Sequence, residues 1–219
     1  MNLRESIDVA GPLGYPSKMP GTSYGISAHA CITGTKLAKV EGSVCHDCYA
    51  LKANYEYPSV AQAHETRLQG LSNPAWTGAM VMMILRAHAL GKGRNGPIAV
   101  GWHRWHDSGD LQSVAHLEKI CDVARKTPKI KHWLPTRELA IVKAFEKGGG
   151  IVPKNLVIRV SATMVDGDAT QAWPTTSRVH TIKAAKGART CPAPKQEGKC
   201  GDCRACWNPK VKSVSYQLH

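Results

Sequence analysis

The cysteines are the residues of this chain whose spacing most clearly predicts chemistry. Eight cysteines occur among the 219 residues, and seven of them fall into two groups, one near each end. Thiolates repeated at two-residue gaps let a short loop direct several sulfurs at one centre, as zinc ions and iron–sulfur clusters require. The expected metal ligands are Cys31, Cys45 and Cys48 in the first group, and Cys191, Cys200, Cys203 and Cys206 in the second.

The C-terminal group has the more specific pattern. A Cys-Pro pair at 191–192 is followed by three cysteines separated by two-residue gaps. Bacterial ferredoxins use the same elements in the opposite order, whereas zinc sites more often pair two Cys-x2-Cys units. We therefore expect an iron–sulfur cluster at this group, with zinc as the alternative.

The N-terminal group supplies three thiolates, which would leave one iron of a [4Fe-4S] cluster open to a substrate or a cofactor. His46 and Asp47 lie inside the motif and could act as further ligands. We expect two clusters, but the pattern is also compatible with one cluster shared by both groups, or with zinc at one of them. Cys121 lies on an apolar helical stripe and is expected in the core instead.

Alternating strand and helix patterns predict the scaffold that positions these loops. Expected strands cover residues 98–102, 130–134 and 156–160, and expected helices cover 114–124 and 138–147. Short strands alternating with helices are typical of parallel βα units joined by right-handed crossovers. The sequence therefore predicts an α/β fold, a partial (β/α) barrel with cysteine-rich metal-binding loops near both termini.

The chain is expected to form a single domain over residues 1–219. Residues 31–57 would form the N-terminal cysteine loop, 97–165 the βα core, and 190–219 a C-terminal cysteine-rich extension. Residues 1–30 are rich in Gly, Pro and Ser, and are expected to be irregular apart from a short strand near 23–29. Two further helices are expected, one opened by Pro58 and one running from Asn73-Pro74 to about Leu90.

Ligands of parallel α/β folds bind beyond the carboxyl ends of the strands, where this chain has short polar segments. The residues expected to line a cofactor pocket there are Ser108, Gly109, Asp110, Arg137, Arg159 and Ser161. Asp110 is equally placed to cap a helix beginning near residue 111. Arg159 interrupts an apolar strand and would need a cluster or a carboxylate as partner. His103 and His106 are candidates for ligands or acid–base groups.

Four segments together resemble a family of phage-encoded proteins, the Gene product 88 family. They are Cys45-His-Asp-Cys-Tyr-Ala50, Ser108-Gly-Asp110, Trp133-Leu-Pro-Thr-Arg-Glu138 and the cysteine-rich ending. The resemblance runs from about residue 21 to residue 207. It implies a viral or prophage origin and brings no activity with it.

More distantly, the layout is similar to that of radical SAM enzymes. That resemblance implies that the first cysteine group holds a cluster whose open iron chelates S-adenosylmethionine, with Ser108-Gly-Asp110 as the turn that holds the methionine amine. The spacing here is C-x13-C-x2-C rather than C-x3-C-x2-C, and Tyr49 follows the last cysteine rather than preceding it.

Lys and Arg exceed Asp and Glu by 29 to 16, which gives a formal net charge of +13. Such a surplus favours anionic partners such as nucleic acid, although a basic surround would also offset the negative charge of thiolate-bound clusters. No apolar run is long enough to span a bilayer and no signal peptide opens the sequence. We expect no membrane contact and a cytoplasmic location, which is the host cytoplasm for a phage protein.

These observations predict an iron–sulfur protein with redox or radical SAM-like chemistry at a [4Fe-4S] cluster, supplied by an electron donor. One alternative is a non-catalytic module that transfers electrons or binds nucleic acid. Another is an interaction protein stapled by zinc.

Overall fold

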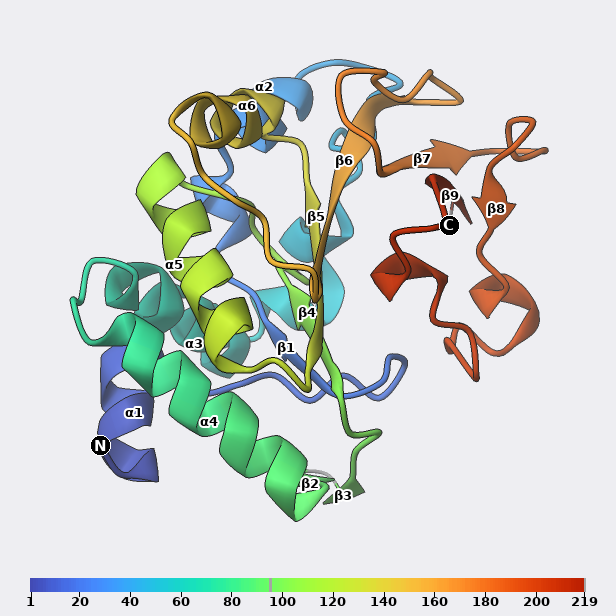
Figure 1. Cartoon of the computed structure of the whole chain (residues 1–219). Coiled ribbons are helices and arrows are strands. Elements are labelled where there is room, and N and C mark those ends of the chain that lie inside the picture. The colour runs from blue at the N-terminus through green and yellow to red at the C-terminus, as the bar shows by residue number, and fades with distance from the viewer. Residues whose placement is uncertain (95, 219) are drawn as a thin grey trace.

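A seven-stranded parallel sheet organises the chain (Figure 1). The structure is a computed structural model and describes residues 1–94 and 96–218. In sheet order the strands are β1 (Thr22–Tyr24), β4 (Trp102–Trp105), β5 (Lys131–Thr136), β6 (Leu156–Val165), β7 (Thr176–His180), β9 (Ser213–Gln217) and β8 (Arg189–Thr190). Every neighbouring pair is parallel, and β1 and β8 are the edges. The α/β class is therefore confirmed, whereas the sheet is open and does not close into a barrel.

The longer helices cover one face of this sheet, on the left in Figure 1. They are α1 (Leu3–Ala10), α3 (Pro58–Gly70), α4 (Trp76–Leu90), α5 (Val114–Lys126) and α6 (Leu139–Lys147). Their apolar side chains form one buried cluster with strand residues such as Tyr24, Trp105, Leu134 and Ile158. No helix among the described residues is long and apolar enough to cross a membrane.

The cysteine segments contain only short elements. The N-terminal segment carries α2 (Ile32–Leu37), and the single-turn 3-10 helices are η1 (Ala28–Ala30), η2 (Tyr49–Leu51), η3 (Ala53–Glu56), η4 (Ala193–Lys195) and η5 (Ala205–Trp207). The C-terminal segment lies beside the sheet on the right in Figure 1, away from the helices. The two faces of the sheet are therefore covered by different material, helices on one and loops on the other.

Alternation along β4 assigns side chains to these two faces. His103 and Trp105 point into the helix side, where Trp105 packs against Trp76 of α4 at a ring-centroid distance of 6.0 Å. Arg104 points to the loop side and lies over the ring of Trp133 at 4.7 Å. The loop side is therefore the face that meets the cysteine segments.

Most of the elements predicted for the βα core are confirmed. Helix α5 begins where Ser113 accepts a hydrogen bond from the backbone N–H of His116, so the expected cap at Asp110 was wrong. The strand expected at 98–102 was also wrong, because β4 covers Trp102–Trp105 instead. The preceding residues form a two-stranded hairpin, β2 (Lys92–Gly93) with β3 (Gly96–Pro97). The apolar run at residues 98–100 follows this hairpin and lies outside the main sheet.

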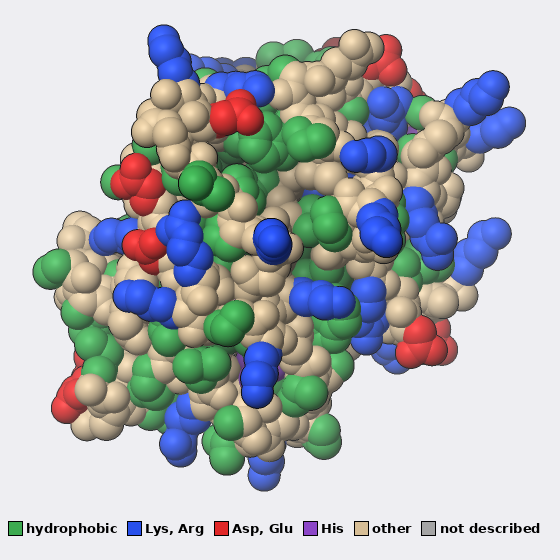
Figure 2. All heavy atoms as spheres, in the orientation of Figure 1, with side chains coloured by type: hydrophobic (Ala, Val, Ile, Leu, Met, Phe, Trp, Pro, Cys, Tyr) green, Lys and Arg blue, Asp and Glu red, His purple; other side chains and the backbone are tan. Residues whose placement is uncertain are grey.

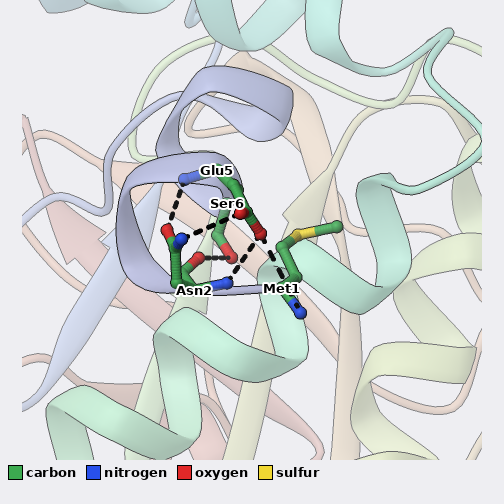
Figure 3. A network of polar contacts seen from close by, with 4 residues as sticks. All are labelled: Met1, Asn2, Glu5 and Ser6. Carbon is green, nitrogen blue, oxygen red and sulfur yellow. Dashed lines mark hydrogen bonds and ion pairs between the residues drawn. The ribbon is translucent and has the colours of Figure 1, made fainter.

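The N-terminus is helical rather than irregular, and Figure 3 shows why. The Asn2 side chain accepts a hydrogen bond from the backbone N–H of Glu5, and the Glu5 carboxylate accepts one from the backbone N–H of Asn2. This reciprocal capping box satisfies two N–H groups that a first helical turn leaves free. The motif Asn-x-x-Glu at residues 2–5 is the sequence signal from which α1 could have been predicted.

The sheet also continues past the expected core. Strand β7 lies between the expected core and the expected cysteine-rich extension at 190–219, β8 lies at the start of that extension, and β9 lies within it. Strands β7 and β8 are short and mostly polar, so periodicity does not distinguish them from loops. Strand β9 does alternate, with Val214 and Tyr216 on either side of Ser215, so its signal was present in the sequence and was missed.

Candidate functional site

The N-terminal cysteine segment lies across the carboxyl ends of β4, β5 and β6. Thr33 donates from its backbone N–H and its hydroxyl to the carboxylate of Glu138, at 2.7 and 2.8 Å. The backbone N–H of Val44 donates to the carbonyl of Thr163 at 2.9 Å. The Tyr49 hydroxyl donates to the carbonyl of Asp107 at 2.8 Å. The segment is therefore fixed to the edge where ligands of parallel sheets bind.

The thiols of Cys31 and Cys45 share one space although the two residues are distant in sequence. A Cβ atom placed on Gly34 would lie 3.5 Å from the sulfur of Cys31 and 3.7 Å from that of Cys45. The same atom would lie only 2.8 Å from the Cβ of Cys31, so the absence of a side chain at Gly34 leaves room for these two thiols. The structure therefore places Cys31 and Cys45 close together, with Cys48 in the same segment, while the full ligand set stays a prediction.

Burial holds the thiols of Cys31 and Cys45 in their protonated form near neutral pH. Burial, followed by the charge of Asp110, raises the pKa of the Cys31 thiol to about 12. Burial also raises the pKa of Cys45, and the guanidinium of Arg137 opposes that rise. The buried Nε of Arg137 has no hydrogen-bond partner among the described residues. A positive group with a free donor therefore faces the thiols.

Asp110 connects the ends of two strands beneath this pocket. Its carboxylate accepts hydrogen bonds from the backbone N–H groups of Leu111 and Arg137 and from the hydroxyl of Thr136. Burial raises the pKa of Asp110 to about 6, and these hydrogen bonds oppose the rise. Asp110 is therefore a bridge from β4 to β5 rather than a helix cap.

Ser108 and Gly109 form the turn that leads to Asp110. The carbonyl of Ser108 accepts from the backbone N–H of Ile26 at 3.0 Å, and its buried hydroxyl has no partner among the described residues. Gly109 has a φ of 76°, and a Cβ there would lie 2.4 Å from a side-chain carbon of Ile26. The turn is packed against the segment that follows β1.

Replacing Gly109 with alanine is expected to destabilise the fold by at least about 2 kcal/mol, since strain at positive φ and a clash act together. Gly149→Ala is the matched control, because Gly149 has a φ of 82° but open space around the new Cβ. Urea unfolding would compare the two variants. Equal losses for both would contradict the close contact with Ile26.

The C-terminal thiols are gathered as well, on the loop side of the sheet. The charges of Cys191 and Cys203 act on Cys200, and those of Cys191 and Cys200 act on Cys206. Burial raises the pKa of Cys206 to about 12, opposed by a contact of 3.2 Å between its sulfur and the Tyr216 hydroxyl. The C-terminal cysteine segment thus lies beside the sheet, whereas the N-terminal one lies across the ends of its strands.

Arg159 holds this C-terminal segment in place. It is fully buried in the centre of β6, and no carboxylate pairs with it among the described residues. Its guanidinium instead donates five hydrogen bonds of 2.9–3.2 Å to the backbone carbonyls of Thr176, Ala205, Cys206, Asn208 and Val211. Arg159 therefore lies beneath the C-terminal cysteines rather than beside the N-terminal ones.

Ser161 lies farther along β6 and is half-buried. Its hydroxyl exchanges a hydrogen bond of 2.9 Å with the hydroxyl of Ser177 on the neighbouring strand. The structure thus divides the six predicted pocket residues. Four surround the strand ends near the N-terminal cysteines, namely Ser108, Gly109, Asp110 and Arg137, while Arg159 and Ser161 lie on β6.

Arg104 lies between the two cysteine groups and was not among the predicted site residues. It donates to the Tyr49 hydroxyl at 3.3 Å and to the sulfur of Met19 at 3.1 Å. Its charge also acts on Cys200 and on Tyr216. Tyr49 directly follows Cys48, so Arg104 connects the surroundings of both groups. The sequence signal that could have identified Arg104 as a site residue is its position between Trp102 and Trp105, next to a predicted strand.

The buried histidines belong to the helix side. His103 exchanges a hydrogen bond of 2.8 Å with Thr22, and the rings of His106 and His116 are 5.2 Å apart. Burial lowers the pKa of His103 and of His106 well below the ordinary value. The sequence raised both as candidates for ligands or acid–base groups; the structure places them in the core, away from the thiols. Cys121 is also buried in this core, as predicted.

Neither cysteine group is arranged as a single-ion site. Within residues 1–94 and 96–218, no set of three or more His, Cys, Asp or Glu side chains could hold a metal ion as arranged. A zinc site needs four ligands drawn around one ion at about 2.3 Å for each sulfur. An iron–sulfur cluster is a larger body, with each thiolate on a separate iron, so its ligands stand farther apart.

Comparison with known proteins supports one relationship. The chain matches the family described as Gene product 88 over residues 4–209. Neither the search of curated proteins nor the search of solved structures gave a match. The matched region includes every one of the seven clustered cysteines and the polar ends of β4 and β5. The chain belongs to the Gene product 88 family.

Proposed function

We propose that this protein is an iron–sulfur protein with two [4Fe-4S] clusters. Cys31, Cys45 and Cys48 would hold the first and leave one iron open, and Cys191, Cys200, Cys203 and Cys206 would hold the second. The observation that carries the proposal is the convergence of the Cys31 and Cys45 thiols beside the Arg137 guanidinium, whose buried Nε has no partner among the described residues. Buried thiols give up their protons readily only to a metal or a cluster.

The surroundings of the N-terminal group favour substrate-activating chemistry there. An open iron would face the polar turn of Ser108, Gly109 and Asp110, where a buried serine hydroxyl lacks a partner. When bound and reduced, such a cluster would supply one electron to a ligand. The finer form of the proposal is that this ligand is S-adenosylmethionine, with the carboxylate of Asp110 near its amine and Arg137 near its carboxylate.

The C-terminal group has four thiols and therefore no open iron in this proposal. Its role would be to pass electrons from an external donor towards the first cluster. Arg104 supports this arrangement, since its guanidinium contacts Tyr49 on one side and acts on Cys200 on the other. We further infer that the open sheet is an incomplete (β/α) barrel, and that the protein works in the host cytoplasm.

A non-catalytic electron carrier is the second candidate, and binding of S-adenosylmethionine separates the two. Equilibrium dialysis with labelled S-adenosylmethionine under anaerobic conditions would show about one site per chain for the enzyme. No binding to protein with a full complement of iron would leave electron transfer as the function. A salt-insensitive affinity would further favour a specific site.

Substitution of each cysteine group is expected to remove one cluster. A variant with serine at residues 31, 45 and 48 should lose about half of the iron and sulfide, and so should a variant with serine at 191, 200, 203 and 206. Cys121→Ala is the matched control and should keep all of both, because Cys121 lies in the apolar core. EPR of the reduced proteins would identify the cluster that each variant retains. Unchanged iron content in either cysteine variant would contradict the proposed ligand set.

A further inference from the structure

A basic pocket lies at the opposite end of the sheet from the N-terminal cysteines. Its volume is about 760 Å³. One wall comes from residues at the amino ends of β4, β5 and β6, including Trp102, Lys131 and Asn155, and the other comes from residues 202–211. Of the residues that the proposed chemistry uses, Cys203 is the one that contributes to the lining of this pocket.

Positive charge dominates the lining. Six cationic side chains and one carboxylate, Asp202, contribute to it. The cationic residues are Lys129, Lys131, Lys154, Arg189, Arg204 and Lys210. Throughout the part of the chain that the structure describes, none of these six forms an ion pair. Unpaired cations gathered in a hollow create a potential that only an anionic ligand offsets.

Two of these cations, Lys131 and Arg204, make cation–π contacts with the ring of Trp102. The ammonium of Lys131 lies 5.0 Å from the ring centroid of Trp102, and the guanidinium of Arg204 lies 5.2 Å from it. Arg204 also donates to the backbone carbonyls of Gly201 and Cys203. Cation–π contacts hold both charges at fixed positions on the wall without neutralising them.

Lys and Arg side chains are spread over the face of the molecule drawn in Figure 2, while most carboxylates lie towards its edges. A single small anion would offset only part of the charge of the six cations that line the pocket. A chain of phosphates would offset more of it, because its charges repeat along its length.

We propose that this pocket binds the phosphate backbone of a nucleic-acid strand. The concave shape and the spread of cations over several segments fit a narrow, multiply charged chain better than the convex surface of an acidic protein. Lys129 and Lys154 lie in the connections before β5 and β6, and Lys131 is the first residue of β5, so all three lie outside both cysteine segments. Their contribution to the pocket therefore does not depend on whether the cysteines hold clusters.

The test compares two triple variants of the full-length protein. Lys129→Gln/Lys131→Gln/Lys154→Gln removes three charges from the pocket, and Lys147→Gln/Lys183→Gln/Lys186→Gln removes three exposed charges elsewhere. Fluorescence anisotropy would measure the binding of labelled single strands of about 12 nucleotides, a length within the usual site sizes. DNA and RNA strands would be separate arms, and circular dichroism would confirm that both variants are folded.

The pocket variant should bind either strand at least about tenfold more weakly than the wild type near 0.1 M salt, and the slope of log K against log salt should fall by roughly 2. The control should keep most of the affinity. Equal losses in both variants would overturn the proposal, because the binding would then depend on net charge alone. Competition by polyglutamate as effective as competition by unlabelled strand would overturn it in favour of an acidic protein partner. Binding of ATP without binding of any strand would also overturn it.

Discussion

Replacing Arg159 with leucine is expected to lower the free energy of unfolding by at least about 3 kcal/mol, because a buried acceptor left unpaired costs roughly 1–3 kcal/mol. The variant would remove five hydrogen bonds to backbone carbonyls, four of them in the segment that follows Cys203. The carbonyls of Ala205 and Asn208 would each keep one backbone donor, so the loss falls mainly on the other three. The leucine would also lie at the centre of the sheet, where water has little access. Few other single changes in this chain would remove so many hydrogen bonds.

Urea unfolding followed by circular dichroism would measure this loss. Arg4→Leu is the matched control, since Arg4 is 87% exposed and should change stability very little. Arg159→Lys is informative as well, because an ammonium keeps the charge but cannot reach five carbonyls in a planar fork. A loss of less than about 1 kcal/mol for Arg159→Leu would show that the C-terminal segment does not depend on this guanidinium.

Stability is expected to fall by about 6 kcal/mol between pH 7 and pH 5, a loss comparable to the whole stability of many domains. Four buried histidines cause it, namely His103, His106, His116 and His132. Burial lowers the pKa of all four in the folded state, that of His116 and of His132 to about 3.

The sign follows from proton uptake. Below pH 6.5 the unfolded chain binds a proton at each of these histidines, whereas the folded chain does not until the pH approaches the lowered pKa. Each histidine therefore contributes a loss of up to about 1.4 kcal/mol per pH unit as the pH falls through this window. Asp110 acts in the opposite direction, because its pKa is raised to about 6 and the folded state takes up its proton first.

Urea unfolding at several pH values would test this dependence. His106→Asn should reduce the slope by about one proton, and asparagine suits the φ of 53° at this position. His29→Asn, at an exposed position, should leave the curve unchanged. A flat stability between pH 7 and pH 5 would mean that the histidines are not buried as described.

The sequence predicted the parts of the fold that carry a clear hydrophobic period. Helix α5 and strands β5 and β6 have apolar residues at regular steps, and each lies close to its expected place. Strands β7 and β8 have no such period, whereas β9 alternates polar and apolar residues and could have been predicted. The order of all three in the sheet depends on neighbours that are distant in sequence. Periodicity in one segment holds no information about such partners.

The candidate site was predictable in composition but not in geometry. Two-residue gaps were enough to identify the cysteines, and strand ends were enough to place Asp110 and Arg137 near the first group. Arg159 was recognised as unusual, but its partners are carbonyls of a loop that follows it by more than forty residues. The direction in which His103 points depends on which face of the sheet the helices cover, and the sequence left that open.

The most direct test of the account is the content of iron and acid-labile sulfide in protein purified without oxygen. Two [4Fe-4S] clusters require about eight of each per chain, together with a rhombic EPR signal after reduction by dithionite. About four of each would mean a single cluster and would contradict the assignment of one cysteine group. Zinc without sulfide would contradict the iron–sulfur account altogether.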